Sequence, residues 1–136
     1  MMSNSLRTVA TICLAVAAAG VCAAPAGADP GQSELSLSVS KGEAQSPTAE
    51  QVTLTCDPAG GSHPASVEAC AALATSGGAF DKLAGDPGVF CTKIYDPVTA
   101  TAAGTWRGQN FQWQRTFGNT CELRAATTPV FDFVTS

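Results

Sequence analysis

Charge and histidine are scarce in this chain of 136 residues, and their scarcity excludes several classes of protein. Charged residues make up 13% of the sequence, the formal net charge is −4 at pH 7, and His63 is the one histidine. An acidic chain with few cations offers no basic surface for nucleic acid or an anionic membrane, so we expect neither as a partner. A lone histidine in a turn is more often a solvated or capping residue than a general base.

Catalytic and metal-binding motifs are also missing. The sequence contains no G-x-S-x-G, no H-E-x-x-H and no Gly-rich phosphate loop, and its acidic residues form no close pair suited to acid–base chemistry. No C-x-x-C pair accompanies the single histidine, so zinc binding is a poor interpretation of the cysteines. We therefore expect no catalytic residue, no metal and no cofactor, and we expect that the protein is not an enzyme.

Only one long apolar run is present, at the N-terminus. Arg7 precedes an uncharged stretch at residues 9–24, which is shorter than the roughly 20 residues that a membrane-spanning helix needs. Small residues follow, and Ala26-Gly27-Ala28 has the form that signal peptidase cleaves. We predict a signal peptide at residues 1–28, with cleavage after Ala26 as the alternative, and a secreted, soluble domain at residues 29–136.

Four cysteines follow the predicted signal peptide: Cys56, Cys70, Cys91 and Cys121. An even number in an exported domain of this size predicts two disulfides, because a small core needs covalent support. The sequence permits three pairings. We prefer Cys56–Cys70 with Cys91–Cys121, because local closure is the simplest topology and suits the segments between the cysteines.

Five segments carry strand signals. Apolar and polar residues alternate at residues 35–39, 52–56, 98–102 and 111–117, and Val130, Phe131 and Phe133 are apolar near the C-terminus. Alternation of this kind indicates strands with one buried face. Arg107 and Gly108 lie between the third and fourth segments, where we expect a hairpin bend.

A first helix is expected in the middle of the chain. Pro64 suits a first helical position, and Gly77-Gly78 provides the stop. The face expected to be buried comprises Val67, Cys70, Leu73 and Ala74. Phe80 and Leu83 predict a short helical turn after it.

A second, shorter helix is expected after Asn119. Glu122 follows Asn119 by three residues, which is an N-cap pattern and places Cys121 in the first helical turn. Strands and helices together predict an α+β domain: a five-stranded antiparallel sheet with two helices packed on it and two disulfides.

The most informative stretch is Phe90-Cys91-Thr92-Lys93-Ile94-Tyr95-Asp96-Pro97. A lysine in a loop is ordinarily a solvated charge, but this one has an unusual setting. Cys91 tethers the chain just before Lys93, and Pro97 stiffens it just after. A segment held on both sides is preorganised to lie extended in a protease cleft, and a disulfide keeps the new ends close if the chain is cut.

Several longer motifs accompany this loop: Val52-Thr53-Leu54-Thr55-Cys56, Gly61-Ser62-His63-Pro64 before a helix with Ala69-Cys70, Cys91-Thr92-Lys93-Ile94-Tyr95-Asp96-Pro97-Val98, Trp106-Arg107-Gly108, and Phe117-Gly118-Asn119-Thr120-Cys121-Glu122. On these motifs the sequence resembles the Streptomyces subtilisin inhibitor family over residues 35–133. The resemblance implies the disulfide pairing preferred above, a five-stranded sheet with two helices, and in most members a homodimer. Aromatic residues at 111–117 suit contact with a second copy, or otherwise core packing.

The resemblance also implies a reactive bond two residues after the third cysteine. Lys93 would then fill the primary specificity pocket of a serine protease, and Ile94 would follow the scissile bond. Phe90, Cys91 and Thr92 would lie along the subsites before that bond, with Tyr95 in the contacting loop after it. A lysine at this position is associated with inhibition of trypsin-like as well as subtilisin-like enzymes. The alternative is a secreted binding module that has lost inhibitory action; a small hydrolase is a distant third.

Overall fold

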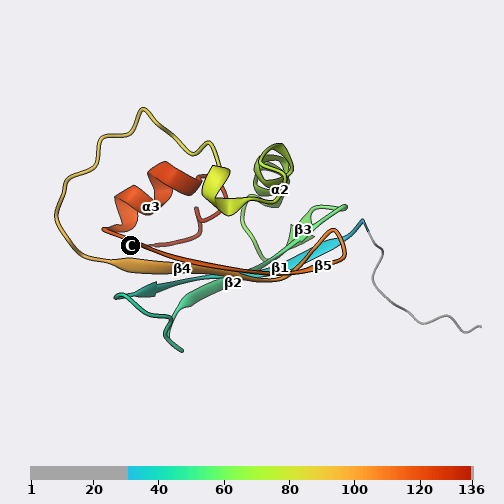
Figure 1. Cartoon of the computed structure of the whole chain (residues 1–136), viewed down its shortest axis with the longest axis horizontal. Coiled ribbons are helices and arrows are strands. Elements are labelled where there is room, and N and C mark those ends of the chain that lie inside the picture. Colours follow the sequence, from blue (N-terminus) through green and yellow to red (C-terminus); the bar gives the residue numbers. More distant parts are fainter. Residues whose placement is uncertain (1–30, 136) are drawn as a thin grey trace, which may run out of the picture.

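The computed structural model describes residues 31–135, so the predicted signal peptide, residues 1–28, lies outside the described residues. A five-stranded sheet, in the order β3-β2-β1-β4-β5 with antiparallel neighbours, forms one layer, and the helices cover one of its faces (Figure 1). The strands are β1 Ser33–Lys41, β2 Glu50–Cys56, β3 Gly60–Gly61, β4 Val98–Trp106 and β5 Gln109–Phe117. The helical elements are α2 Ser66–Thr75, the 3-10 turn η2 Phe80–Lys82, and α3 Thr120–Thr127. The predicted α+β class is confirmed.

The core lies between the sheet and the helices. Leu35 and Leu37 of β1 are fully buried, and their neighbours on β4 are small residues, Gly104 and Ala102. Gly104 is required here, because a Cβ on it would lie 2.1 Å from the carbonyl oxygen of Glu34. Alternation along these strands places their hydroxyl-bearing residues on the opposite face of the sheet.

The predicted hairpin bend is confirmed. Arg107 and Gly108 connect β4 to β5 with φ angles of 49° and 83°. Positive φ at both central residues is typical of the tight turns whose twist matches that of the flanking strands. Phe111 and Trp113 of β5 each stack on Phe80 with ring centroids 5.1 Å apart. These two rings therefore belong to the core rather than to a surface for a second copy.

The strand predicted at residues 130–133 is wrong. These residues form turns after α3, although Val130 and Phe131 are fully buried. Burial explains their apolar character without a strand. The fifth strand is instead β3, where Gly61 pairs with Leu54 of β2. A Cβ on Gly61 would lie 2.3 Å from the carbonyl oxygen of Thr53, so glycine at this position is needed for close strand pairing.

Helix α2 differs in detail from the prediction. It begins at Ser66 rather than Pro64, and its buried residues are Ala69 and Leu73, one turn apart. The predicted inward position of Val67 is wrong, since this side chain is 66% exposed. Val67 lies two positions before Ala69, which places the two side chains on opposite sides of a helix. Ala74 is also exposed. The predicted helical turn after α2 is confirmed as η2.

His63 is buried rather than solvated, with 5% of its surface exposed. Its Nδ1 accepts a hydrogen bond from the Ala65 N–H at 2.9 Å, and its Nε2 lies 2.8 Å from the carbonyl oxygen of Val130. Since Nδ1 is an acceptor, Nε2 carries the proton and donates it to Val130. His63 does not cap α2, whose N-cap residue is Ala65 and which has no side-chain cap hydrogen bond, so both parts of the prediction are wrong. This histidine joins the start of α2 to the C-terminal turns.

Both preferred disulfides are confirmed. Cys56 and Cys70 join β2 to α2 with their Cα atoms 5.6 Å apart, and Cys91 and Cys121 join the connection before β4 to α3 with a separation of 5.7 Å. Among the described residues no helix is long and apolar enough to cross a membrane.

Candidate functional site

The connection from η2 to β4 holds the exposed apolar residues of the site. It arches outside α3, drawn in yellow to orange in Figure 1, with no helix or strand of its own. Phe90 is 100% exposed, Ile94 70% and Tyr95 65%. Large apolar side chains gathered on one exposed segment mark a surface that contacts another molecule. We refer to residues 90–97 as loop 90–97.

Loop 90–97 is attached covalently at its beginning. The Cys91–Cys121 disulfide links it to the first turn of α3, where the sequence predicted Cys121 to lie. Lys93 follows two residues later, and its side chain is 89% exposed. Thr92 and Lys93 therefore lie directly beside the attachment point but face solvent.

Asn119 supports the centre of the loop. Its Oδ1 accepts a hydrogen bond from the Glu122 N–H at 2.9 Å, which confirms the predicted N-cap of α3. Its Nδ2 donates to the carbonyl oxygens of Thr92 at 3.1 Å and Ile94 at 2.9 Å. These carbonyls flank Lys93, so one side chain fixes the backbone before and after it. This second role was not predicted, because no sequence pattern indicates that residues 92–94 lie beside the start of α3.

The end of the loop is held by hydrogen bonds. The Asp96 N–H donates to the carbonyl oxygen of Gly118 at 2.8 Å, and the Tyr95 hydroxyl donates to Oε2 of Glu43 at 2.6 Å. The bond to Glu43 is the main reason that the pKa of Tyr95 lies above its ordinary value. The hydroxyl therefore keeps its proton, and remains a donor, beyond the usual pH range.

Lys93 has a charged neighbour on α3. Its Nζ lies 3.2 Å from Oε2 of Glu122, whose side chain is 31% exposed. A hollow of about 460 Å³ is lined by Val89, Phe90, Cys91, Lys93, Glu122, Ala125 and Ala126. The lysine side chain thus lies along α3 rather than extending straight outward.

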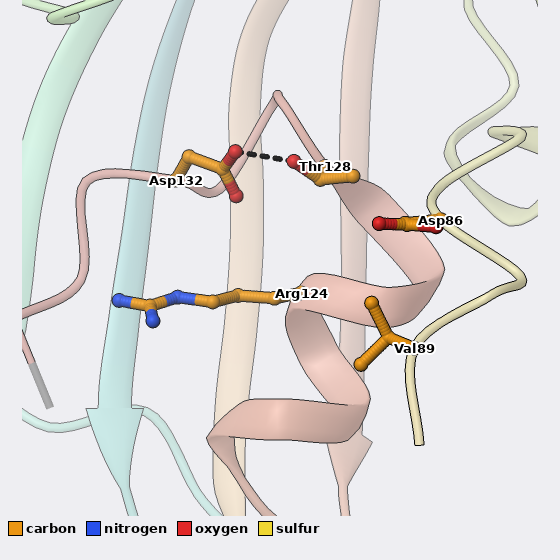
Figure 2. A pocket seen from close by; sticks show the side chains of 5 residues that line it. All are labelled: Asp86, Val89, Arg124, Thr128 and Asp132. Atoms are coloured by element: carbon orange, nitrogen blue, oxygen red, sulfur yellow. Dashed lines mark hydrogen bonds between the residues drawn. The ribbon is translucent and has the colours of Figure 1, made fainter. Parts of the chain in front are cut away.

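A second hollow, of about 330 Å³, lies further along α3 (Figure 2). Its lining residues are Asp86, Val89, Arg124, Thr128 and Asp132. The Thr128 hydroxyl donates to the Asp132 carboxylate, and the Arg124 guanidinium donates to the carbonyl oxygen of Val134. Within residues 31–135 no cluster of three or more His, Cys, Asp or Glu side chains is suited to a metal. Asp86 accepts a hydrogen bond from the Gly88 N–H, so the polar side chains that line this hollow have partners within the fold, and we assign it to packing of the connection on α3.

A small disulfide-linked domain that presents an exposed loop on a fixed backbone is the architecture of a protein that binds other proteins. Comparison with known proteins makes the class specific. Residues 31–119 match the family model "Subtilisin inhibitor-like". The chain is 50% identical over 102 residues to Subtilisin inhibitor-like protein 5 of Streptomyces fradiae, which covers 73% of this chain and 95% of that protein.

Two further relatives extend the comparison. Trypsin inhibitor STI2 of Streptomyces longisporus is 42% identical over 147 residues, covering 97% of this chain and 100% of that protein. The crystal structure of Streptomyces caespitosus sermetstatin in complex with Bacillus licheniformis subtilisin is similar with a TM-score of 0.66 and 38% identity, over 76% of this chain and 100% of that chain. This chain belongs to the subtilisin inhibitor-like family, whose members are protease inhibitors and not enzymes.

Proposed function

We propose that this protein is a secreted inhibitor of serine endopeptidases, of both the subtilisin-like and the trypsin-like kind. It binds them as a substrate does, with Lys93-Ile94 as the scissile bond. The observation that supports this most directly is the pair of hydrogen bonds from Asn119 to the carbonyls of Thr92 and Ile94, on either side of an exposed lysine. Of the relatives, one is named a trypsin inhibitor and another was solved in complex with subtilisin.

The residues of loop 90–97 have distinct roles in this function. Lys93 enters the primary specificity pocket of the protease, with Thr92, Cys91 and Phe90 along the subsites that precede the bond. Ile94 and Tyr95 follow it. Because the backbone is held before binding, little conformational entropy is lost in the complex. The Cys91–Cys121 bridge keeps the Lys93 end in place if the protease cuts the bond.

The direct test is Lys93→Met. A trypsin-like pocket holds a buried carboxylate, and removing the lysine ammonium leaves that carboxylate unpaired, which costs roughly 2 to 5 kcal/mol. Since about 1.4 kcal/mol corresponds to a factor of ten, trypsin inhibition should weaken at least tenfold. Subtilisin pockets are broad and mainly apolar, so subtilisin inhibition should stay nearly unchanged. Lys82→Met, on the exposed 3-10 turn, is the matched control.

Two outcomes contradict this assignment. Equal losses against trypsin and subtilisin would mean that Lys93 acts through the structure of the loop. Long incubation with catalytic protease at mildly acidic pH should produce a chain that begins at Ile94, and any other new N-terminus would move the reactive bond. A binding module without inhibitory action, the alternative function, would not titrate subtilisin stoichiometrically.

We also propose export and dimerisation. The apolar run before Ala28 supports cleavage of residues 1–28, which the N-terminal sequence of the protein from culture medium would test. A homodimer is supported by the family and by the accessible part of the outer face of the sheet, which carries uncharged hydroxyl and amide side chains: Ser36, Gln112 and Gln114. Light scattering at micromolar concentration should give the mass of two chains, and a monomer mass would contradict this.

A further inference from the structure

We propose that the end of β1 and the turn after it, at Lys41, Gly42 and Glu43, form a second support for loop 90–97, and that Glu43 is a positioning residue for the half of the loop released when Lys93-Ile94 is cut. This inference rests on the proposed function and deepens it. It concerns how the protein remains an inhibitor after cleavage. The contacts that hold the loop before Lys93 do not explain this, because they hold only one of the two new ends.

The two halves of the loop are anchored differently. Before the scissile bond, Cys91 is joined to Cys121 by a disulfide. After the bond, the next element is β4, which begins at Val98. Residues 94–97 have no covalent attachment except the chain itself, so after a cut the Ile94 amine would be held by noncovalent contacts alone, among them the hydrogen bonds from Asn119 to the Ile94 carbonyl and from the Asp96 N–H to the Gly118 carbonyl. Noncovalent contacts must hold that segment near the protease.

The turn after β1 supplies backbone contacts to this segment. The Gly42 N–H donates to the carbonyl oxygen of Pro97 at 2.8 Å, and the Gly42 carbonyl accepts from the Thr99 hydroxyl at 2.9 Å. Gly42 has a φ of 94°, a conformation that favours glycine. The turn is thus fixed against the start of β4 by hydrogen bonds on both of its polar backbone groups.

The neighbours of Gly42 supply side-chain contacts. The Glu43 carboxylate accepts the Tyr95 hydroxyl hydrogen bond at 2.6 Å, and Lys41 Nζ lies 3.4 Å from Oδ2 of Asp96. A carboxylate acceptor makes a stronger hydrogen bond than a neutral one. Three consecutive residues therefore contact three consecutive residues that follow Ile94. Tyr95 is the nearest of these to the new amine.

The reactions that cut and re-form the Lys93-Ile94 bond explain why the position of the Ile94 amine matters. The protease serine oxygen attacks the Lys93 carbonyl carbon while its proton passes to the enzyme's base, the bond to the Ile94 nitrogen breaks, and the Ile94 amine leaves with that proton. Water then attacks the ester carbon, which restores the serine hydroxyl and gives the cleaved chain with a Lys93 carboxylate. In religation the ester forms again with loss of that water; the amine attacks the ester carbon and gives a proton to the base, which returns it to the departing serine oxygen. The rate of religation depends on the amine remaining close and aligned. With Tyr95 held to Glu43, the amine one residue earlier stays beside the ester.

The experiment compares Glu43→Gln, Tyr95→Phe and the double variant. Each is incubated with catalytic subtilisin until the ratio of intact to cleaved inhibitor is constant, and the rate of cleavage in the complex is measured separately. Each single variant should shift the ratio toward cleaved chain by about three- to tenfold, the range expected for one charge-assisted hydrogen bond. The double variant should shift it no further than either single one, because both remove the same bond.

Glu50→Gln is the matched control. Glu50 also accepts a hydrogen bond from a hydroxyl, that of Thr135 at 2.8 Å, but Thr135 lies near the C-terminus. This variant should leave the ratio unchanged. The thermal midpoint of Glu43→Gln should match the wild type, because its hydrogen bond is exposed.

Several results would overturn the inference. Suppose that the wild type inhibits and is cut at Lys93-Ile94. If the ratio of intact to cleaved inhibitor is then unchanged in both single variants, the turn does not support loop 90–97. Additive shifts in the double variant would show that the two residues act independently. A lowered thermal midpoint would indicate a general loss of stability. Failure of the proposed function is distinguishable, since the wild type itself would then neither inhibit nor be cut at Lys93-Ile94.

Discussion

Two regions of this molecule are built from the same parts and differ in what those parts do. In the core region, Cys56–Cys70 and His63 tie β2, α2 and the C-terminal turns together, and the histidine is 5% exposed. In the loop region, Cys91–Cys121 and Asn119 tie loop 90–97 to α3, and the atoms that they hold face solvent. Burial therefore decides whether such bonds stabilise the fold or position an exposed backbone.

The loop-closure entropy of the two disulfides does not by itself explain how the two regions differ. The bridges span 14 and 30 residues. In the chain-entropy model, closures of this size contribute about 3 and about 4 kcal/mol to the free energy of unfolding. The larger value belongs to the loop bridge, although fewer core contacts depend on it. The expected difference is therefore functional, and each prediction below tests one half of the comparison.

The largest effects are expected from the disulfides. Replacing Cys91 and Cys121 by Ser should free the Lys93 end of the loop, so that subtilisin cuts the variant at least about tenfold faster than the wild type, as a substrate. Replacing Cys56 and Cys70 by Ser should lower the free energy of unfolding by about 3 kcal/mol but leave inhibition intact where the protein is folded. Cleavage rates and denaturant melts measure both. A loop variant that inhibits with an unchanged cleavage rate would disprove the tether.

The next effect concerns His63. Its replacement by Ala would leave the buried Val130 carbonyl oxygen and the part-buried Ala65 N–H without their partners. An unpaired buried group costs about 1 to 3 kcal/mol and a part-buried one less, so we expect the free energy of unfolding to fall by about 2 to 4 kcal/mol. Urea melts measure the change. Inhibition per folded molecule should be unaffected, and a change in the cleavage rate at Lys93-Ile94 would contradict the separation of the two regions.

The sequence predicted the core region better than the loop region. Strands with alternating residues, such as 35–39, were found because a half-buried strand imposes its period on the chain. The number of cysteines predicted two disulfides but permitted three pairings, and the preference for local closure selected the one that the structure confirms. Val67 and residues 130–133 were misassigned because apolar character indicates burial without saying which face or element provides it. Gly60 and Gly61 carry no strand signal, since a two-residue strand has no period.

The loop region depends on contacts between distant residues. Asn119 was recognised as a helix cap because that bond is local, to Glu122. Its bonds to Thr92 and Ile94 span 27 and 25 residues, and the bond from Tyr95 to Glu43 spans 52. Contacts of this kind arise from how the sheet and α3 pack, and no short pattern encodes them. They became visible only in the folded structure.

Substitutions at Asn119 can separate its role as the cap of α3 from its support of the loop backbone. In Asn119→Asp and Asn119→Ser a side-chain oxygen remains to cap α3, but the donors to the Thr92 and Ile94 carbonyls are lost. Two exposed hydrogen bonds of about 0.5 to 1.5 kcal/mol each correspond to roughly tenfold faster cleavage at Lys93-Ile94. The thermal midpoint should change little. If both variants are cut at the wild-type rate, Asn119 acts only as a cap.

The smallest effect is expected at Glu122, and its sign is the opposite of the others. The Lys93 ammonium lies 3.2 Å from this carboxylate in the free protein and must leave it to enter a specificity pocket. Exposed ion pairs contribute about 0.2 to 1 kcal/mol, so Glu122→Gln should tighten inhibition of trypsin by up to about fivefold at low salt. Because salt screens exposed charges, the gain should shrink at about 0.5 M NaCl. It should vanish when Lys93 is already Met, since no ammonium is then held. An equal change in the Lys93→Met background would show that Glu122 acts through the start of α3, which would make it part of the support for the backbone rather than a competitor for the lysine.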